Sequence, residues 1–261
     1  MRYLHAGSGQ PVLLVHGLMG YSFSWRHVIP ALAERHEVFA IDSVGTGFSE
    51  RPAKLDCGLK ASGQRLLRFM DAVGADQFDL VGTSHGGAVA LMAACLLPAR
   101  VRRLVLAAPV NPWAPRGKKL APFLSHPLVK PIFARAAHRS VAMRRYYFNR
   151  LWGDKRRIPV DVFEGYMKPL DKLSAWDYPM SILQRWNADL RELELALPRI
   201  GGIRTLLIWG SRDGGVAPKS AERLKQNFRN CQLVVMDGIG HLPYEEAPEE
   251  FNRTVREFLG S

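Results

Sequence analysis

The stretch Phe78-Asp79-Leu80-Val81-Gly82-Thr83-Ser84-His85-Gly86-Gly87-Ala88-Val89-Ala90 decides the fold of this chain. An apolar run leads into the pentapeptide Gly82 to Gly86, and a helical pattern of small residues follows it. A serine at a sharp strand-to-helix turn needs flanking glycines, because its backbone is strained and the strand and helix pass close together. Such a turn exposes the hydroxyl above the sheet. The context therefore favours Ser84 as a nucleophile over a serine that only caps the following helix.

Short apolar runs alternate with helical patterns on both sides of this stretch. Strands are expected at 11–15, 38–41, 78–81, 101–107, 204–209 and 232–236, and helices at 23–35, 62–73, 218–227 and 248–259. Continuous apolar strands bounded by helices indicate a parallel sheet that is covered on both faces. The predicted fold class is α/β, with a mostly parallel, doubly wound sheet.

Residues 113–190 interrupt the alternation. Five prolines break the chain between 112 and 131, helical patterns follow at 132–152 and 180–197, and no strand pattern is present. This window holds fifteen Lys and Arg against six Asp and Glu, and twelve of the twenty-five aromatic residues, in a chain whose net charge is +12. A shift this sharp predicts an inserted helical module at 113–190, within a core formed by 1–112 and 191–261.

Two residues that could activate Ser84 follow the later strands. A serine hydroxyl is a poor nucleophile until a base removes its proton, and that base needs a carboxylate to fix its tautomer. Asp213 follows the strand that ends at Gly210, and His241 follows the last strand. The carboxyl ends of parallel strands are where functional side chains gather. We therefore predict Ser84, Asp213 and His241 as a catalytic triad, in the order expected for this fold.

Acyl transfer also needs N–H donors for the oxyanion. One predicted donor is the backbone N–H of His85, because it begins a helix whose dipole favours negative charge. The second is expected in the loop His16-Gly17-Leu18-Met19-Gly20, where glycines allow the backbone to turn inward. We favour the N–H of Leu18, with Met19 as the alternative.

These segments together resemble the α/β-hydrolase superfamily, and in particular its members with a helical cap. The resemblance rests on the His16-Gly17 loop, residues 42–52, the turn at Ser84, and Asp213 and His241 with Pro243 and Glu246. It implies the triad and a lid formed by 113–190. The chain departs from the family pattern in having room for only the second strand of the usual first hairpin, around 2–5. It also carries Val44 where the family usually has proline.

Several nearby polar residues are interpreted as structural. His16 is expected to hold the oxyanion loop, and the imidazole of His85 to line the pocket at most. Asp42, with the glycines that follow it, is expected to form a tight turn. The alternative position for the catalytic acid lies after the preceding strand, but residues 110–112 offer no carboxylate there.

Composition limits the remaining classes of function. No apolar run is long enough for a membrane span, and no signal peptide is visible at the N-terminus. Cys57, Cys95 and Cys231 are widely spaced, which predicts neither a disulfide framework nor a zinc site and favours the cytoplasm. No metal or cofactor is expected, and the glycines after Asp42 are not placed as a dinucleotide fingerprint.

The predicted function is hydrolysis of carboxylic esters through an acyl-enzyme, with a hydrophobic, short-to-medium acyl or alcohol group. Alternatives are a C–C bond hydrolase of vinylogous diketones, a membrane-associated lipase or acyltransferase, and a ligand receptor on the same scaffold. The C–C hydrolase ranks lower because Leu242, not an aromatic residue, follows His241. Epoxide hydrolases and dehalogenases are disfavoured because their nucleophile is a carboxylate. The expected partner is a small ester; no nucleic acid is expected, and the basic module also fits an anionic membrane surface.

Overall fold

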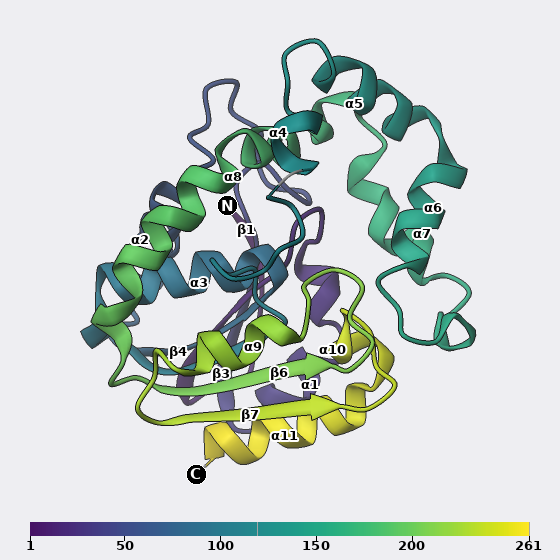
Figure 1. Cartoon of the computed structure of the whole chain (residues 1–261). Helices are drawn as coiled ribbons and strands as arrows, with labels where there is room; N and C mark the ends of the chain where they lie inside the picture. The colour runs from purple at the N-terminus through teal and green to yellow at the C-terminus, as the bar shows by residue number, and fades with distance from the viewer. Residues whose placement is uncertain (119, 261) are drawn as a thin grey trace.

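A seven-stranded sheet forms the centre of the molecule (Figure 1). The computed structural model describes residues 1–118 and 120–260. The strand order is β1-β3-β2-β4-β5-β6-β7, and every neighbouring pair is parallel except β1, which runs antiparallel to β3. The strands are β1 Arg2–Ala6, β2 Gln10–Val15, β3 His36–Asp42, β4 Phe78–Thr83, β5 Val101–Ala107, β6 Arg204–Gly210 and β7 Cys231–Met236. This arrangement confirms the predicted fold class, and β1 is the N-terminal strand that the sequence predicts.

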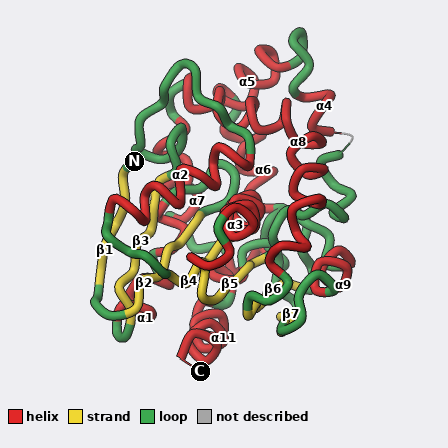
Figure 2. The backbone as a smooth tube through the Cα atoms, turned by 90° about the vertical axis from the view of Figure 1, so that its left-hand side faces the viewer, coloured by secondary structure: helices red, strands yellow, loops and turns green. Residues whose placement is uncertain are grey.

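Helices cover both faces of the sheet, and alternate strand residues point into two separate cores. Leu13 lies in the core shared with α2 (Leu59–Ala72), α3 (Ser84–Leu96) and α9 (Lys219–Lys225). Leu14, the next residue, lies in the core shared with α1 (Val28–Ala33) and α11 (Pro248–Gly260). Figure 2 shows the strands as a layer between these two sets of helices. The continuous apolar runs of the sequence follow from this burial on both faces.

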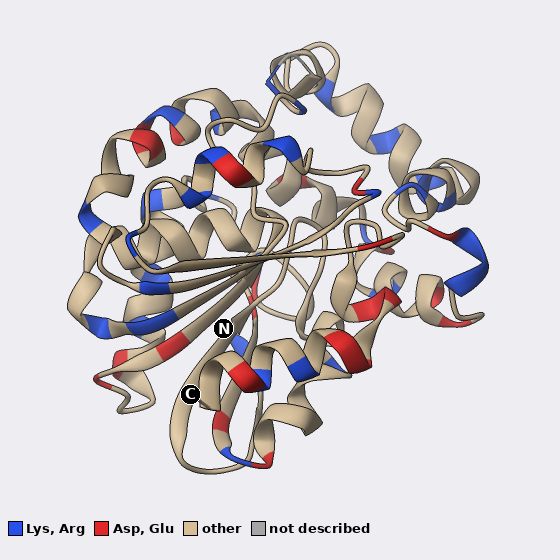
Figure 3. Ribbon diagram, turned by 60° about the horizontal axis from the view of Figure 1, so that its bottom comes forward, with Lys and Arg blue, Asp and Glu red and all other residues tan. Residues whose placement is uncertain are grey.

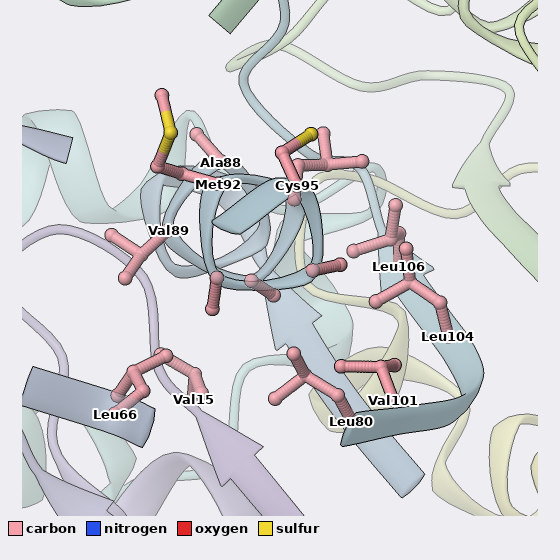
Figure 4. Close-up of a cluster of buried hydrophobic side chains, with 14 of the residues drawn as sticks. Val15, Leu66, Leu80, Ala88, Val89, Met92, Cys95, Val101, Leu104 and Leu106 are labelled. Atoms are coloured by element: carbon pink, nitrogen blue, oxygen red, sulfur yellow. The ribbon is translucent and has the colours of Figure 1, made fainter. Parts of the chain in front are cut away.

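The helix that begins at Ser84 is buried on nearly all sides. Eleven of the thirteen residues of α3 are buried, and none of those eleven is charged at neutral pH. Figure 4 shows Leu80 of β4 and Leu104 of β5 beside α3 on one side, and Val15 and Leu66 on the side toward which Val89 points. A helix that is apolar all round belongs at the centre of a protein, so the catalytic turn predicted at Ser84 is built on a rigid element.

The segment between β5 and β6 is helical, and we call residues 113–190 the helical insert. It contains α4 (Leu120–Leu124), α5 (Lys130–Arg139), α6 (Val141–Asn149), α7 (Val162–Met167) and most of α8 (Asp177–Ala196). Among its described residues there is no strand. Residue 190 lies inside α8, and Leu190 and Leu193 pack in the core beside α3. The insert and the core therefore share a helix.

The helical pattern predicted at 132–152 is divided between two helices. The chain breaks at Ser140, between α5 and α6, where the backbone is extended. The Ser140 hydroxyl accepts a hydrogen bond from the N–H of Met143 at 3.1 Å. A serine in this position satisfies the otherwise unpaired N–H groups of a new helix, and it therefore starts α6 in a new direction.

Short helices complete the chain between these elements. They are α10 (Pro243–Glu246) and the 3-10 turns η1 (Ser22–Trp25), η2 (Pro98–Arg100), η3 (Lys155–Arg157), η4 (Lys168–Leu170), η5 (Leu173–Trp176) and η6 (Leu197–Ile200). The helix predicted at 23–35 is divided between η1 and α1. Two of these short elements, α10 and η3, flank the loops described below.

Candidate active site

The turn from β4 into α3 has the strained geometry that its glycines predict. Ser84 has φ +52°, a left-handed value that is unusual for a residue with a side chain. A Cβ at Gly82 would lie 2.8 Å from the carbonyl oxygen of Gly86, and a Cβ at Gly86 would collide with the carbonyl oxygen of His16. Only glycine fits at both positions. Strain at a residue that the surrounding structure holds in place is a feature of functional sites.

Asp213 and His241 meet at the carboxyl edge of the sheet, on loops after the neighbouring strands β6 and β7. His241 Nδ1 lies 2.9 Å from Asp213 Oδ2, and both residues are buried. The other carboxylate oxygen accepts the N–H groups of Gly215 at 2.6 Å and Val216 at 2.9 Å. Because an ionised carboxylate only accepts hydrogen bonds, the facing nitrogen of His241 is the donor, and Nε2 remains free to accept a proton.

A cavity of about 680 Å³ is lined by both the predicted serine and the predicted histidine. Ser84, His85 and His241 line it from the core. Phe133, Met143 and other side chains of the helical insert line it from the opposite side. Asp213 does not line the cavity but lies behind His241. The insert thus covers the space in front of Ser84, and the lining is largely apolar.

The glycine loop after β2 passes directly beside Ser84. A Cβ at Gly17 would lie 3.0 Å from Ser84 Cβ, so the absence of a side chain at 17 permits this approach. The N–H of Gly20 bonds to the carbonyl of Gly17 at 3.0 Å, and Met19 between them has φ +64°. Leu18 and Met19 both line the cavity. The loop lies beside Ser84, and its role in binding an oxyanion, with the choice of Leu18 over Met19, stays a prediction.

His16 fixes the position of that loop, in agreement with its structural interpretation. Its Nδ1 lies 2.8 Å from the Gly17 carbonyl oxygen, and its Nε2 accepts the N–H of Ser43 at 3.0 Å. Burial lowers the pKa of His16, so the ring is neutral and one nitrogen donates while the other accepts. The ring therefore ties the oxyanion loop to the turn that follows β3.

Asp42 belongs to a structural turn, as the sequence predicts. Its two carboxylate oxygens accept the N–H of Ser22 at 2.8 Å and the N–H of Phe48 at 2.9 Å. These hydrogen bonds lower the pKa of Asp42 although burial opposes them. Gly47 lies against the carboxylate with φ +51°, where a side chain would collide with it. The carboxylate also accepts the Arg2 guanidinium of β1 at 3.1 Å, so these partners are all structural.

The imidazole of His85 lines the cavity beside Trp186, with ring centroids 6.4 Å apart. Burial, with a smaller contribution from His16, lowers the pKa of His85 to about 4. The ring is therefore uncharged near neutral pH. This placement agrees with the prediction that the side chain lines the pocket, and the role of the backbone N–H stays a prediction.

Glu246 holds the His241 loop to the helical insert. Its carboxylate accepts three backbone N–H groups, from Gly153 at 2.9 Å, Asp154 at 2.8 Å and Gly240 at 2.8 Å. The N–H of His241 also bonds to the carbonyl of Leu151 at 2.6 Å. The sequence marks Glu246 only through its family resemblance. Two of its partners, Gly153 and Asp154, lie about ninety residues away, and no local pattern reveals them.

Two further contacts between the core and the insert have no clear signal in the sequence. Glu245 accepts a paired hydrogen bond from the Arg26 guanidinium, at 2.5 and 2.6 Å, and another from the Tyr166 hydroxyl at 2.6 Å. Arg116 of the insert donates to the carbonyl oxygens of Gly214 and Asp213. Both loops that carry the Asp213–His241 pair are therefore supported by the insert.

The position after β5, the alternative for a catalytic acid, has a structural residue. Asn111 donates to the carbonyl of Pro109 and to the Ser220 hydroxyl, both at 3.0 Å. The three cysteines are free thiols. None of the described helices combines the length and apolar composition of a membrane span. Across the described residues, no group of three or more His, Cys, Asp or Glu side chains is placed to hold a metal ion.

A mostly parallel sheet, a strained serine turn and a histidine–carboxylate pair at its carboxyl edge together define the class of α/β hydrolases. Residues 10–248 match the family described as the alpha/beta hydrolase fold, and the chain belongs to this family. The protein is accordingly a hydrolase.

Relatives within the family act on different substrates, to judge from their names. The chain is 30% identical to the 2-hydroxy-6-oxo-2,4-heptadienoate hydrolase of Pseudomonas putida, over 98% of this chain and 91% of the relative. It is 29% identical to haloalkane dehalogenase 2 of Mycobacterium bovis, over 100% and 91%.

Solved structures with a similar fold likewise differ in the activities that their names state. A meta-cleavage product hydrolase from Pseudomonas fluorescens IP01 superposes with a TM-score of 0.83 at 26% identity, over 99% of this chain and 93% of that one. A bacterial membrane phospholipase A superposes with a TM-score of 0.80 at 25% identity, over 99% and 81%. Family membership therefore leaves the substrate to be argued from the site.

Proposed function

We propose that the protein hydrolyses carboxylic esters through a serine acyl-enzyme. The single observation that carries the proposal is that Ser84, at a strained turn, shares a cavity with His241, whose Nδ1 is held by Asp213. Position 84 is a serine, which favours acyl transfer over the carboxylate-based chemistry of dehalogenases.

In the proposed mechanism, Ser84 Oγ attacks the ester carbonyl carbon while His241 Nε2 takes its proton. Asp213 keeps the ring in the tautomer that leaves Nε2 free and stabilises the imidazolium. The N–H groups of Leu18 and His85 stabilise the tetrahedral oxyanion. His241 then protonates the departing alcohol. It next activates a water molecule that attacks the acyl carbon, and Ser84 is released with the acid.

The cavity supports an apolar substrate. Met143, Phe133 and Trp186 are among its walls, and about 680 Å³ is within the range of sites that enclose a drug-sized molecule. A cavity of this volume favours a medium-chain acyl group over a short one. We expect activity to increase along a series of p-nitrophenyl esters from acetate to the medium-chain acids.

Replacement of Ser84 by alanine tests the mechanism. We expect kcat/KM for p-nitrophenyl esters to fall at least about a thousandfold, because the nucleophile is lost and its partners act only through it. Ser24→Ala is the matched control. Ser24 also lines the cavity but has no place in the proposed mechanism, so this variant should keep near-normal activity. Full activity in Ser84→Ala would rule out the proposed mechanism.

A C–C bond hydrolase is the second candidate, favoured by the similarity to a 2-hydroxy-6-oxo-2,4-heptadienoate hydrolase. Such a reaction would use the same serine and histidine. A 2-hydroxy-6-oxo-dienoate assayed beside the esters separates the two candidates. A kcat/KM at least about tenfold higher for the dienoate favours the C–C hydrolase, and one at least about tenfold higher for an ester favours the esterase. Labelling of Ser84 by a fluorophosphonate without turnover of any substrate would instead favour a ligand receptor.

A further inference from the structure

The outer surface of α4 and α5 exposes large apolar side chains at close intervals. Four of them lie within residues 120–132: Leu120 is 56% exposed, Phe123 62%, Leu128 74% and Ile132 69%. We call this surface, with the exposed face of α5, the α4–α5 surface. Single exposed apolar residues are ordinary, but a group of them marks an interaction surface. Figure 1 shows α4 and α5 at the end of the molecule remote from α11.

The charge of this part of the chain has one sign. Residues 113–150 contain nine Lys and Arg and no Asp or Glu. Arg135 and Arg139 are exposed and lie three and seven residues after Ile132, so the three side chains share one face of α5. The opposite face of α5 buries Ala137 against Trp176. Figure 3 shows how Lys and Arg are distributed over the ribbon.

The same surface is continuous with the walls of the cavity. Leu120 is more than half exposed and also lines the cavity that contains Ser84. Tyr146 and Tyr147 of α6 likewise line it while being 58% and 54% exposed. An apolar molecule held against the α4–α5 surface would therefore lie beside side chains that also line the cavity.

We propose that the α4–α5 surface docks on a membrane whose lipids carry anionic headgroups. Phe123, Leu128 and Ile132 enter the boundary between headgroups and acyl chains, and Arg135 and Arg139 contact lipid phosphates. A second copy of this chain is a poorer occupant, because two acid-free basic surfaces would repel one another. A polyanion such as nucleic acid would use the arginines but leave the apolar side chains unexplained.

Vesicle binding tests the charge component. The probes are vesicles of phosphatidylcholine alone and of phosphatidylcholine with 30% phosphatidylglycerol, assayed by co-sedimentation at low and high salt. We expect binding to the anionic vesicles to be at least about tenfold stronger and to weaken with salt. Arg135→Gln combined with Arg139→Gln should reduce it at least about tenfold. Arg229→Gln with Arg253→Gln removes the same charge from exposed positions outside the insert and should bind like the unmodified protein.

Replacement of exposed apolar residues by serine tests the apolar component of vesicle binding. Phe123→Ser with Ile132→Ser should bind the anionic vesicles at least about tenfold more weakly. Leu195→Ser, at a position that is 82% exposed on α8, is the control and should bind normally. Equal binding to neutral and anionic vesicles would overturn the proposal. So would undiminished binding by the Phe123 and Ile132 variant, or a stable dimer in sedimentation velocity that both pairs of α4–α5 substitutions dissolve.

Docking does not depend on the chemistry proposed at Ser84. The Ser84→Ala protein should bind vesicles like the unmodified protein, and vesicle binding can therefore fail or succeed separately from ester hydrolysis.

Discussion

At the scale of single residues, the pairing of His241 with Asp213 assigns different tasks to the two ring nitrogens. Nδ1 donates to the carboxylate, which is itself fixed by the N–H groups of Gly215 and Val216. A Cβ at Gly215 would lie 2.8 Å from the His241 ring, so the loop packs directly against the imidazole. The ring has little freedom to rotate, and His241 lines the same cavity as Ser84.

The buried imidazole of His85 should make the protein sensitive to acid. Its pKa is about 4 in the folded protein and 6.5 in the unfolded chain. The unfolded chain therefore binds a proton first as the pH falls, and stability that is fully present above pH 6.5 is lost progressively toward pH 4. Between pH 7.5 and pH 5 we expect this residue to lower the free energy of unfolding by about 2 kcal/mol.

Urea unfolding at the two pH values measures this effect. From pH 7.5 to pH 5, the free energy of unfolding of His85→Gln should decrease by about 2 kcal/mol less than that of the unmodified protein. His27→Gln, at an exposed position, should retain the full decrease. An unchanged pH dependence in His85→Gln would contradict the assignment of a strongly lowered pKa to this ring.

At the scale of elements, short segments far apart in the sequence hold the catalytic loops. The four-residue helix α10 places Glu245 and Glu246 side by side, and each binds a different part of the helical insert. The Glu245 carboxylate accepts a hydrogen bond from the Tyr166 hydroxyl of α7. The Glu246 carboxylate accepts hydrogen bonds from the N–H groups of Gly153 and Asp154, which precede η3. The loop that carries His241 is therefore supported by the insert as well as by the sheet.

Loss of the Glu246 carboxylate should destabilise this junction. Glu246→Ala leaves three backbone N–H groups without their acceptor, and we expect the free energy of unfolding to fall by about 3 kcal/mol. Glu246→Gln keeps one oxygen acceptor, and its free energy of unfolding should fall by less. Glu250→Ala, at an exposed position of α11, should change stability by no more than about 0.5 kcal/mol. A Glu246→Ala protein as stable as the Glu250→Ala protein would show that the junction is unimportant.

At the scale of the whole molecule, burial differs sharply between the sheet and the insert. Eleven residues of α3 are buried between the sheet and α2 or α8, whereas only Ala137 is buried in the ten-residue α5. Local unfolding requires less free energy where few apolar contacts are broken. The architecture therefore predicts a rigid core that carries Ser84 and a less stable outer part of the insert.

Hydrogen exchange should report this difference directly. We expect the amides of α5 to exchange at least about a hundredfold faster than those of α3, because α5 opens without global unfolding. Exchange followed by mass spectrometry on peptides from the two helices makes the comparison within one sample. Equal protection of α5 and α3 would mean that the insert unfolds only together with the sheet.

The sequence by itself determined the alternation of strands and helices, the turn at Ser84 and the positions of Asp213 and His241. These features depend on local chemistry: apolar runs that are buried on both faces, glycines that a strained turn requires, and loops at the carboxyl ends of parallel strands. Each can be recognised within about ten residues of chain.

Only the tertiary structure decided how the insert joins the core and what it covers. The break at Ser140, the hydrogen bonds of Glu246 and the shared helix α8 all depend on contacts between distant segments. The cavity in front of Ser84 has walls from both the core loops and the insert. Its shape follows from how side chains more than a hundred residues apart pack together, and no local pattern in the sequence encodes that packing.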